Sequence, residues 1–520
     1  MKVLLTSAEA VPFAKVGGLA DVVGSLPIAL RKLGIDARVM IPGYGFINHL
    51  EYAIEPLISF NFPHRLGTNE VSVYSCLHDG TPYYLLQSPP YFGLEGEIYS
   101  EWNWDMERFI YLNQALMATV WRMNEAIGWF PDLFHVNDWH TSLLPFLVHS
   151  NRDVSEWASL ATVLSIHNIA YQGNHAGGFL FQAGIDGREP ADLASIDLTD
   201  NLLGIGIAYS EMISTVSPRY AEEITYPYAG YELAPLIGKR SADLRGILNG
   251  LDTEVWNPAT DPCLFQNFDV GNFEGKRPPN KGHLQSFARL PVAPDVPLIG
   301  IVSRLAAQKG FDMALPALRQ LLVERDAQLV VLGTGESDLE YAFWQLDQDF
   351  PDQATAFLQF DSALAQQIYA GCDLFLMPSH FEPCGMGQMM AMRYGALPLV
   401  RETGGLADTV KNYDNGDAET GTGFVFHWQE VSALRGTLDW AIDVYHQNPA
   451  AWRRMQERGM RMDFSWEKSA GEYIELYELA RDKVEARSRS AAAKRSVALT
   501  QNRKPARRMS DAVNVNRSRS

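Results

Sequence analysis

The sequence predicts an α/β protein made of two doubly wound domains that face a central cleft. Short apolar runs alternate with helical segments along the chain, which is the pattern of parallel strands joined by crossover helices. This alternation breaks at residues 257–296, which are rich in Pro, Asn, Asp and Gly, and then starts again. Two α/β series separated by a connection therefore indicate two domains.

The predicted boundaries follow from that break. We assign residues 1–250 to the first domain, 251–296 to the connection and 297–460 to the second domain. A helix is expected over residues 461–485. Residues 486–520 form a basic tail, which carries ten Lys or Arg against one acid from Arg487 onward and has almost no large apolar side chains. We predict that it is disordered, and we favour an inert solvated terminus over contact with nucleic acid or an acidic partner.

The individual elements are predicted from apolar runs, helical periodicity and terminating residues. In the first domain we expect a helix from the glycine-rich turn at residues 17–21 to residue 33, another at 104–121, and strands at 3–7, 39–42, 83–86, 133–136, 161–166, 213–216 and 244–250. In the second domain we expect strands at 298–303, 328–332, 356–360, 374–378 and 397–400, and helices at 311–325, 337–349, 363–370, 388–394, 430–446, 450–460 and 466–481.

Composition limits the class of protein. The chain has 520 residues, 47% of them hydrophobic, which is enough for two domains with cores of their own. A net charge of −19 argues against nucleic acid as the main ligand. No apolar run approaches the about 20 residues of a membrane helix, and Glu9 interrupts the start too early for a signal peptide. We therefore expect a cytoplasmic protein without a membrane partner.

The four cysteines, Cys76, Cys263, Cys372 and Cys384, form no C-x-x-C pair. Neither a disulfide framework nor a zinc site is indicated, so we expect free thiols and no metal.

The loop at residues 379–387 follows a predicted strand and precedes a helix, so it should lie at the carboxyl edge of the second sheet. Its small residues allow backbone N–H groups to approach an anion, and it carries the carboxylate of Glu382 and the thiol of Cys384. Glu382 could be a general acid or base, but a glycosidase needs a second carboxylate on the other side of the glycosidic bond, and the sequence does not identify one. The sequence shows no neighbouring base or cation that would activate the Cys384 thiol as a nucleophile, so packing is its expected role.

Two cations are expected at the same edge. Arg304 ends a strand and Lys309 opens the following helix, five residues later. Together they can neutralise a departing diphosphate, whereas a surface ion pair is the alternative interpretation. Lys15, beside Gly17 and Gly18, is a third candidate.

Two further features lie at predicted strand ends. His167-Asn168 follows one strand and Asp138-Trp139-His140 another, and the spacing of these histidines supports no metal site. The word Gly17-Gly18-Leu19-Ala20-Asp21 recurs as residues 404–408, each time opening a helix. This repeat indicates two similar domains with equivalent glycine-rich loops, although no other long repeat supports it.

Taken together, these residues resemble the bacterial glycogen synthase and plant starch synthase family, from Met1 to about Arg481. The motifs that carry the resemblance are Lys15-Val16-Gly17-Gly18-Leu19-Ala20-Asp21-Val22, Asp138-Trp139-His140, Ile166-His167-Asn168, Thr215-Val216-Ser217-Pro218, Asn249-Gly250-Leu251-Asp252, Ser303-Arg304-Leu305, Gln308-Lys309-Gly310, Glu382-Pro383-Cys384-Gly385 and Thr403-Gly404-Gly405-Leu406-Ala407-Asp408. The resemblance implies a GT-B fold of two Rossmann-like domains. It also implies transfer of glucose from ADP-glucose, a substrate, to the non-reducing-end 4-OH of an α-1,4-glucan, with retention of configuration and without metal or cofactor.

The resemblance also implies roles for residues. Arg304 and Lys309 match residues that bind the diphosphate, and His167 and Glu382 match residues that contact the transferred glucose. The catalytic set expected on this basis is His167, Glu382, Arg304, Lys309 and Asp21; the nucleotide-sugar set is Lys15, Gly18, Asn168, Asn249, Arg304, Lys309, Phe360, Cys384 and Gly385; the acceptor side is Glu9, Asp138 and His140. The last helix is expected to cross back onto the first domain.

Three positions depart from the family pattern. Gly387 stands where Thr or Asn is usual, Phe360 where a Tyr commonly stacks on adenine, and residues 91–96 lack an Asp-Arg pair that many relatives carry. A sucrose synthase-like transferase usually has a second Glu at position 390, which is Met here. A glucan phosphorylase would need pyridoxal phosphate and is typically longer. A glucan-binding or regulatory relative without turnover is the alternative from another class, and Gly387 is the one feature that favours it.

Overall fold

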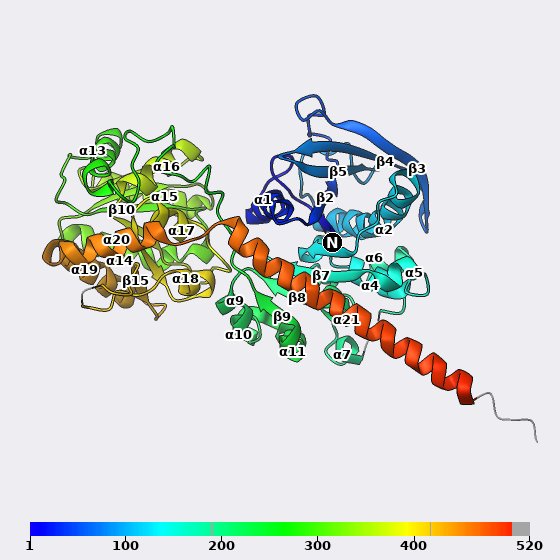
Figure 1. The fold of residues 1–520 in the computed structure, drawn as a ribbon. Helices are drawn as coiled ribbons and strands as arrows, with labels where there is room; N and C mark the ends of the chain where they lie inside the picture. The colour runs from blue at the N-terminus through cyan, green and yellow to red at the C-terminus, as the bar shows by residue number, and fades with distance from the viewer. Residues whose placement is uncertain (189–190, 417, 502–520) are drawn as a thin grey trace, which may run out of the picture.

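The structure is a computed structural model that describes residues 1–188, 191–416 and 418–501. It contains two α/β halves that lie side by side, with the first half in blue to green and the second in green to orange (Figure 1). The long C-terminal helix α21 (Trp466–Gln501) runs from the second half across the first. This arrangement agrees with the predicted fold class.

The first half contains a nine-stranded sheet in the order β3-β4-β5-β2-β1-β6-β7-β8-β9. Its strands are β1 (Lys2–Thr6), β2 (Asp36–Pro42), β3 (Glu55–His64), β4 (Gly67–His78), β5 (Thr81–Gln87), β6 (Leu133–Asn137), β7 (Ala161–Ile166), β8 (Met212–Thr215) and β9 (Leu244–Gly246). The strands from β5 to β9 in this order are parallel, and β6 and β7 are buried along their whole length. This burial explains their uninterrupted apolar sequences.

The helices of the first half pack against this sheet or lie within the segments that connect its strands. They are α1 (Gly18–Lys32), α2 (Trp102–Ile127), α3 (Asp138–Thr141), α4 (Leu144–Ser150), α5 (Ser155–Ser159), α6 (Gly177–Gln182), α7 (Ala191–Ala194), α8 (Leu202–Tyr209), α9 (Pro218–Glu223), α10 (Pro227–Gly230), α11 (Ala234–Lys239), and the short 3-10 turns η1 (Tyr231–Leu233) and η2 (Ser241–Asp243).

The second half contains a six-stranded, fully parallel sheet in the order β12-β11-β10-β13-β14-β15. Its strands are β10 (Leu298–Val302), β11 (Gln328–Leu332), β12 (Ala354–Phe357), β13 (Leu374–Met377), β14 (Leu397–Arg401) and β15 (Phe424–Phe426). The helices are α12 (Phe273–Lys276), α13 (Pro278–Phe287), η3 (Ala307–Lys309), α14 (Phe311–Glu324), α15 (Ser337–Asp349), α16 (Ser362–Gly371), α17 (Gly387–Arg393), α18 (Gly404–Thr409), α19 (Val431–Gln447) and α20 (Pro449–Arg461).

The structure differs from the sequence-based predictions at the antiparallel hairpin β3–β4. It extends the edge of the first sheet and was not predicted. Its strands are half exposed and carry polar residues such as Asn61 and Glu70, so they lack the apolar runs on which the prediction relied.

Strand β12 also differs, because it ends at Phe357 rather than at residue 360. The chain must leave the sheet before Asp361, whose side chain caps α16 by accepting a hydrogen bond from the N–H of Leu364 at 2.9 Å.

The C-terminal helix continues to Gln501, so the predicted end at residue 485 and predicted disorder from residue 486 are wrong as far as residue 501. Ala, Lys and Arg dominate this stretch, and they favour helix without needing a core. Arg487 also anchors it through an ion pair with Glu211 at 2.8 Å. The rest of the predicted tail, residues 502–520, lies outside the described residues.

Helix α21 packs on the first half, against α1, β7 and β8. The Tyr477 hydroxyl hydrogen-bonds Nδ1 of buried His135 at 2.8 Å, and the Ser469 hydroxyl donates to the carbonyl of Leu248 at 2.7 Å. The chain therefore crosses between the halves twice, after β9 and before α21. These crossings touch, because the N–H of Leu251 donates to the carbonyl of Phe464 at 2.6 Å.

The two halves also meet directly where α9 faces α18. The carboxylate of Glu223 accepts a hydrogen bond from the N–H of Gly404 at 3.2 Å. The N–H of Arg219 donates to the carboxylate of Asp408 at 2.8 Å. The second copy of the repeated word is thus part of the contact between the halves.

The two copies of the repeated word differ in their surroundings. A Cβ atom on Gly405 would lie 2.0 Å from the carbonyl oxygen of Cys384, whereas a Cβ atom on its counterpart Gly18, or on the neighbouring Gly17, would meet nothing within 4 Å. The glycine of the second copy is therefore required by close backbone packing.

We predict that Gly405→Ala lowers stability by about 1–3 kcal/mol, because the added methyl forces the 382–384 loop to move. Gly17→Ala is the matched control and should change stability by no more than a few tenths of that amount, because Gly17 has an extended φ of −140° and open space around it. Thermal unfolding followed by circular dichroism measures both. Equal unfolding midpoints for the two variants would contradict the packing argument.

Candidate active site

The order of strands in the second sheet creates a crevice between β10 and β13. The chain proceeds from β10 toward one edge and from β13 toward the other, so the loops that follow these neighbouring strands diverge. Arg304 and Lys309 lie on the loop after β10, and Glu382 lies on the loop after β13. Ligands of open parallel sheets bind at such a crevice.

The first sheet has the same feature between β1 and β6. Glu9 and the glycine-rich turn follow β1, while Asp138 and His140 follow β6 on the other side of the crevice. His167 follows the next strand, β7. Each half therefore contributes its crevice loops to one site.

Loops of both halves line a cavity of about 590 Å³. It brings together most of the predicted site residues: Glu9, Gly18, Asp138, His140, His167, Asn168, Asn249, Arg304, Lys309, Glu382, Cys384 and Gly385. The cavity has the size of a small-molecule site.

Three predicted residues are not in this lining. Lys15 and Asp21 form an ion pair with each other at 2.7 Å, while the neighbouring backbone of residues 16–18 faces the cavity. Phe360 is 89% exposed, because β12 ends before it and the chain turns away to begin α16. The geometry therefore gives no support to a place for Phe360 in the cavity wall.

The two cations of the cavity, Lys309 and Arg304, differ in their partners. The ammonium of Lys309 forms an ion pair with buried Glu382 at 2.7 Å, and the Ser379 hydroxyl donates to the same carboxylate at 3.0 Å. The guanidinium of Arg304 has no hydrogen bond or ion pair with any residue in the described part of the chain. Arg304 is thus the cation most available to an anion, whereas Lys309 also orients Glu382.

His167 is buried and fixed at two points. Its backbone N–H donates to the carboxylate of Asp138 at 2.8 Å, and its ring Nε2 lies 2.9 Å from the amide oxygen of Asn137. The amide nitrogen of Asn137 itself donates to the carbonyl of Thr6, so Nε2 of His167 must carry the proton. Burial lowers the pKa of His167 to about 4, so the imidazole is neutral near pH 7.

Asp138 supports this arrangement under strain. Its φ of +52° is uncommon for a residue other than glycine, and its carboxylate is buried. Burial raises its pKa to about 7, although the backbone N–H groups of His167 and Asn168 lower it in part. Asp138 therefore orients the His167 loop at the cost of holding a poorly solvated charge.

Glu9 holds the glycine-rich turn in place. One oxygen accepts hydrogen bonds from the N–H groups of Val16 at 2.6 Å and Gly17 at 2.9 Å, and the other accepts one from the Tyr99 hydroxyl at 2.5 Å. Both oxygens are engaged, so Glu9 shapes this wall of the cavity.

Two buried polar atoms belong to residues that line the cavity and lack a hydrogen-bond partner within the described ranges. They are Nδ1 of His140 and Oδ1 of Asn249. Burial lowers the pKa of His140 to about 3, so this histidine is also neutral. Unpaired neutral groups of this kind are suited to the hydroxyl groups of a bound ligand.

Sequence reasoning missed the aromatic side of the cavity. Tyr99 stacks on His140 with ring centroids 5.2 Å apart, and Trp102, which is 45% exposed, packs against Trp139 at 5.6 Å. The segment Tyr99-Ser100-Glu101-Trp102 leads into α2, which begins at Trp102, but its sequence alone does not reveal which rings face a cavity.

The residues around the loop of Glu382 have packing roles. Burial raises the pKa of the Cys384 thiol to about 12, so it is not a thiolate near pH 7. Gly385 has a φ of +69°, which favours glycine. A Cβ atom on Gly387 would lie 3.0 Å from the ring of buried Phe375. The absence of a side chain at position 387 is therefore matched by the bulk of Phe375.

No group of metal-ligating side chains is found among the described residues. In the same ranges, no helix is long and apolar enough to cross a membrane.

Comparisons with known proteins agree with the fold. A family model described as starch synthase catalytic domain matches residues 2–239, and one described as glycosyl transferases group 1 matches residues 285–458. The chain is 41% identical to a glycogen synthase of Streptococcus equi subsp. equi (strain 4047) over 482 residues, 92% of this chain and 99% of the relative. It is also 41% identical to a glycogen synthase of Streptococcus sanguinis (strain SK36) over 483 residues, with the same two coverages.

Two solved structures are similar in fold. The catalytic domain of starch synthase IV from Arabidopsis thaliana, bound to ADP and acarbose, has a TM-score of 0.83 and 31% identity, and the match covers 92% of this chain and 99% of that one. Sucrose-phosphate synthase from Thermosynechococcus elongatus has a TM-score of 0.58 at 16% identity, covering 92% and 98% of the two chains, which shows the fold alone.

Two sheets with facing crevices, together with the matched glycosyltransferase models, define a hexosyltransferase of the GT-B fold. The chain belongs to the family of bacterial glycogen synthases and plant starch synthases.

We predict a pH dependence from Asp138. Between its ordinary pKa of 3.8 and its folded pKa of about 7, the folded state keeps a proton that the unfolded state releases. Raising the pH through this range therefore lowers stability. Asp138→Asn removes this term, so its stability relative to the unmodified protein should rise between about pH 5 and about pH 8. Chemical unfolding at both pH values measures the difference, and a difference that does not change with pH would contradict the assignment.

Proposed function

We propose that the protein transfers glucose from ADP-glucose to the non-reducing-end 4-OH of an α-1,4-glucan, with retention of configuration and without a cofactor. One observation carries the proposal: the unpaired guanidinium of Arg304 and the Lys309–Glu382 pair face neutral, hydrogen-bonding residues of the first half across one cavity. A nucleotide sugar needs both surfaces, cations for its diphosphate and neutral polar groups for its hydroxyls. The bound ADP and acarbose of the starch synthase IV structure support these two ligand classes.

In the proposed reaction, Arg304 and Lys309 bind the diphosphate. Negative charge grows on the diphosphate as its bond to glucose breaks, and fixed cations stabilise this charge more in the transition state than in the ground state. Glu382, oriented by Lys309 and Ser379, accepts hydrogen bonds from hydroxyls of the transferred glucose. The departing phosphate takes the proton of the acceptor hydroxyl on the same face of the sugar, which retains configuration.

The first half supplies the sugar-binding side in this proposal. His167 is neutral and its backbone is held by Asp138, so it presents dipoles rather than a charge to the developing oxocarbenium ion. Tyr99, Trp102 and His140 form the wall that takes the acceptor glucan. Aromatic rings and unpaired polar atoms suit a polyhydroxylated ring. On the sequence grounds above, we also propose a cytoplasmic location.

The proposal predicts extension of glycogen in a direct assay. Purified protein is incubated with glycogen and either ADP-glucose or UDP-glucose labelled in the glucose, and label in the polymer is counted. We expect incorporation with ADP-glucose, and greater incorporation than with UDP-glucose. No incorporation with either donor would refute the proposed activity, and a preference for UDP-glucose would refute the donor assignment.

Lys309→Ala should lower kcat by about 10²–10³-fold, because it removes a cation from the developing charge and leaves Glu382 without its partner. Lys239→Ala is the matched control, since Lys239 also pairs with an acid, Asp192, at 2.9 Å but on the exposed surface. Circular dichroism shows whether each variant is folded. Near-normal turnover by folded Lys309→Ala protein would remove Lys309 from the diphosphate site.

A further inference from the structure

A second group of hollows lies outside the reaction cavity, on the side where α9 and α10 face the second half. One hollow of about 390 Å³ lies between the halves and shares Asn168 with the reaction cavity. Another, of about 480 Å³, lies beyond it on the first half and shares Arg219, Glu223 and Tyr228 with it. The three hollows therefore adjoin one another and lead outward from the reaction cavity.

Exposed tyrosines follow this path. Tyr171 lines the reaction cavity and is 63% exposed, while Tyr228 and Tyr231 line the middle hollow. Tyr226, 58% exposed, lines the outer hollow together with Tyr228, which is 71% exposed. Exposed aromatic rings that line a succession of hollows with shared lining residues are unusual on a protein surface and mark a binding site.

The segment that carries these rings is tightly built. It reads Tyr226-Pro227-Tyr228-Ala229-Gly230-Tyr231, and a Cβ atom on Gly230 would lie 1.9 Å from the carbonyl oxygen of Ile224. Tyr231 adopts a φ of +50°, which is a strained conformation for an aromatic residue. Backbone strain of this kind is found where a structure must hold side chains in a particular place.

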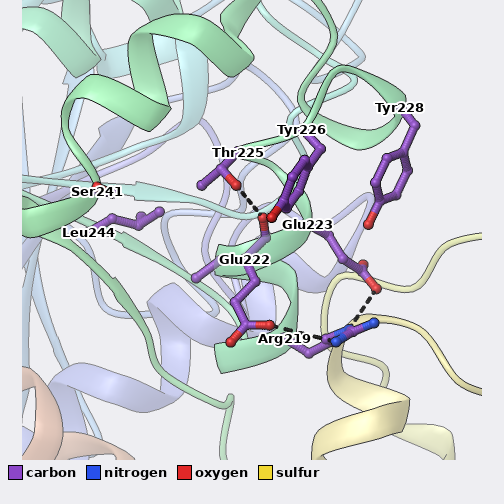
Figure 2. A pocket seen from close by; sticks show the side chains of 9 residues that line it. Arg219, Glu222, Glu223, Thr225, Tyr226, Tyr228, Ser241 and Leu244 are labelled. Carbon is purple, nitrogen blue, oxygen red and sulfur yellow. Dashed lines mark hydrogen bonds and ion pairs between the residues drawn. The ribbon is translucent and has the colours of Figure 1, made fainter.

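Tyr226 and Tyr228 form a platform at the outer end. Their rings are stacked, with centroids 6.1 Å apart and an angle of 18° between the planes. Figure 2 shows both rings side by side, with Glu223 and Arg219 below them. Planar rings beside carboxylates are suited to sugar rings, whose C–H faces stack on the aromatic surface while their hydroxyls donate to the carboxylates.

The charges of the hollows disfavour an anionic ligand. Arg219 lies 3.6 Å from Glu222 and 3.4 Å from Glu223, so its charge is balanced twice over. Arg401, the other arginine of the path, donates to the carbonyls of Ser379 and His380. A neutral ligand with many hydroxyl groups fits this surface better than a nucleotide or a phosphate.

We propose that this path, which we call the tyrosine track (Tyr171, Tyr231, Tyr228 and Tyr226), binds the stem of the α-glucan chain whose end is being extended in the reaction cavity. The inference rests on the proposed function, because the occupant is the acceptor of that reaction. The track adds affinity for long chains without taking part in the bond-forming step. It therefore affects KM for polymeric acceptors and leaves kcat unchanged.

The test is the double variant Tyr226→Ala/Tyr228→Ala, in which two exposed rings at the far end of the track are removed. Tyr341→Ala is the matched control, because Tyr341 is also 58% exposed and also stacks on a neighbouring ring, Trp344, but lies on α15 of the second half. Retardation in native gels that contain glycogen measures binding without the donor. Initial rates with glycogen and with maltotriose measure catalysis.

We expect the double variant to lose about tenfold in affinity for glycogen and to show a similar rise in KM for glycogen, which corresponds to about 1.4 kcal/mol for two stacking contacts. Its kcat and its rates with maltotriose should equal those of the control. Unchanged glycogen affinity, or an equal loss in Tyr341→Ala, would overturn the tyrosine track. If the unmodified protein extends no acceptor with either donor, the proposed function fails, and gel retardation still decides whether the track binds glucan.

Discussion

The ion pair between Lys309 and Glu382 joins the two loops that diverge from the neighbouring strands β10 and β13. A chain of contacts leads from this ion pair to the contact between the halves. The carboxylate of Glu382 is held by Lys309 and Ser379, and the backbone of the same loop packs against Gly404 and Gly405 at distances that exclude a side chain. Through α18 this loop then reaches α9 of the first half. One strand order thus fixes a cation, a carboxylate and the contact between the halves.

The two halves present differently charged groups to the cavity. The second half presents cations, and the first presents histidines that burial keeps neutral, together with an aromatic wall. A positive charge on His167 or His140 would repel a sugar carbon that becomes cationic, so their low pKa values suit a reaction of this type. The neutral, buried histidines of the first half therefore face the cations of the second half across a single cavity.

Most of the strands and the positions of the main candidate site residues could be predicted from the sequence, for physical reasons. Buried parallel strands have uninterrupted apolar sequences, and ligand-binding loops follow the ends of such strands. His167 could therefore be placed at the carboxyl edge of the first sheet, and Arg304, Lys309 and Glu382 at that of the second, from the sequence alone. Other features are set by distant contacts. The hairpin β3–β4 has no apolar run, and Tyr99 and Trp102 look like ordinary helix-start residues. Tyr226 and Tyr228 lie in a short segment whose sequence does not reveal that it borders a hollow. Phe360 was expected at the end of a strand, but β12 ends three residues earlier, at Phe357, and the Phe360 side chain is exposed; its contact with the nucleotide stays a prediction.

The double crossing between the halves has a mechanical consequence. A single connecting strand would let the halves twist as well as open. Here the two connecting segments are bonded to each other at Leu251 and Phe464, and Gly250 lies against Trp466 so closely that a Cβ atom would come within 2.6 Å of its Cα. Two segments that are hydrogen-bonded to each other resist twisting more than a single segment would, so we expect the halves to move mainly by opening and closing about this connection. Because Arg304 and His167 lie in different halves and line the same cavity, a motion of this kind would change the distance between them and so open or close the cavity.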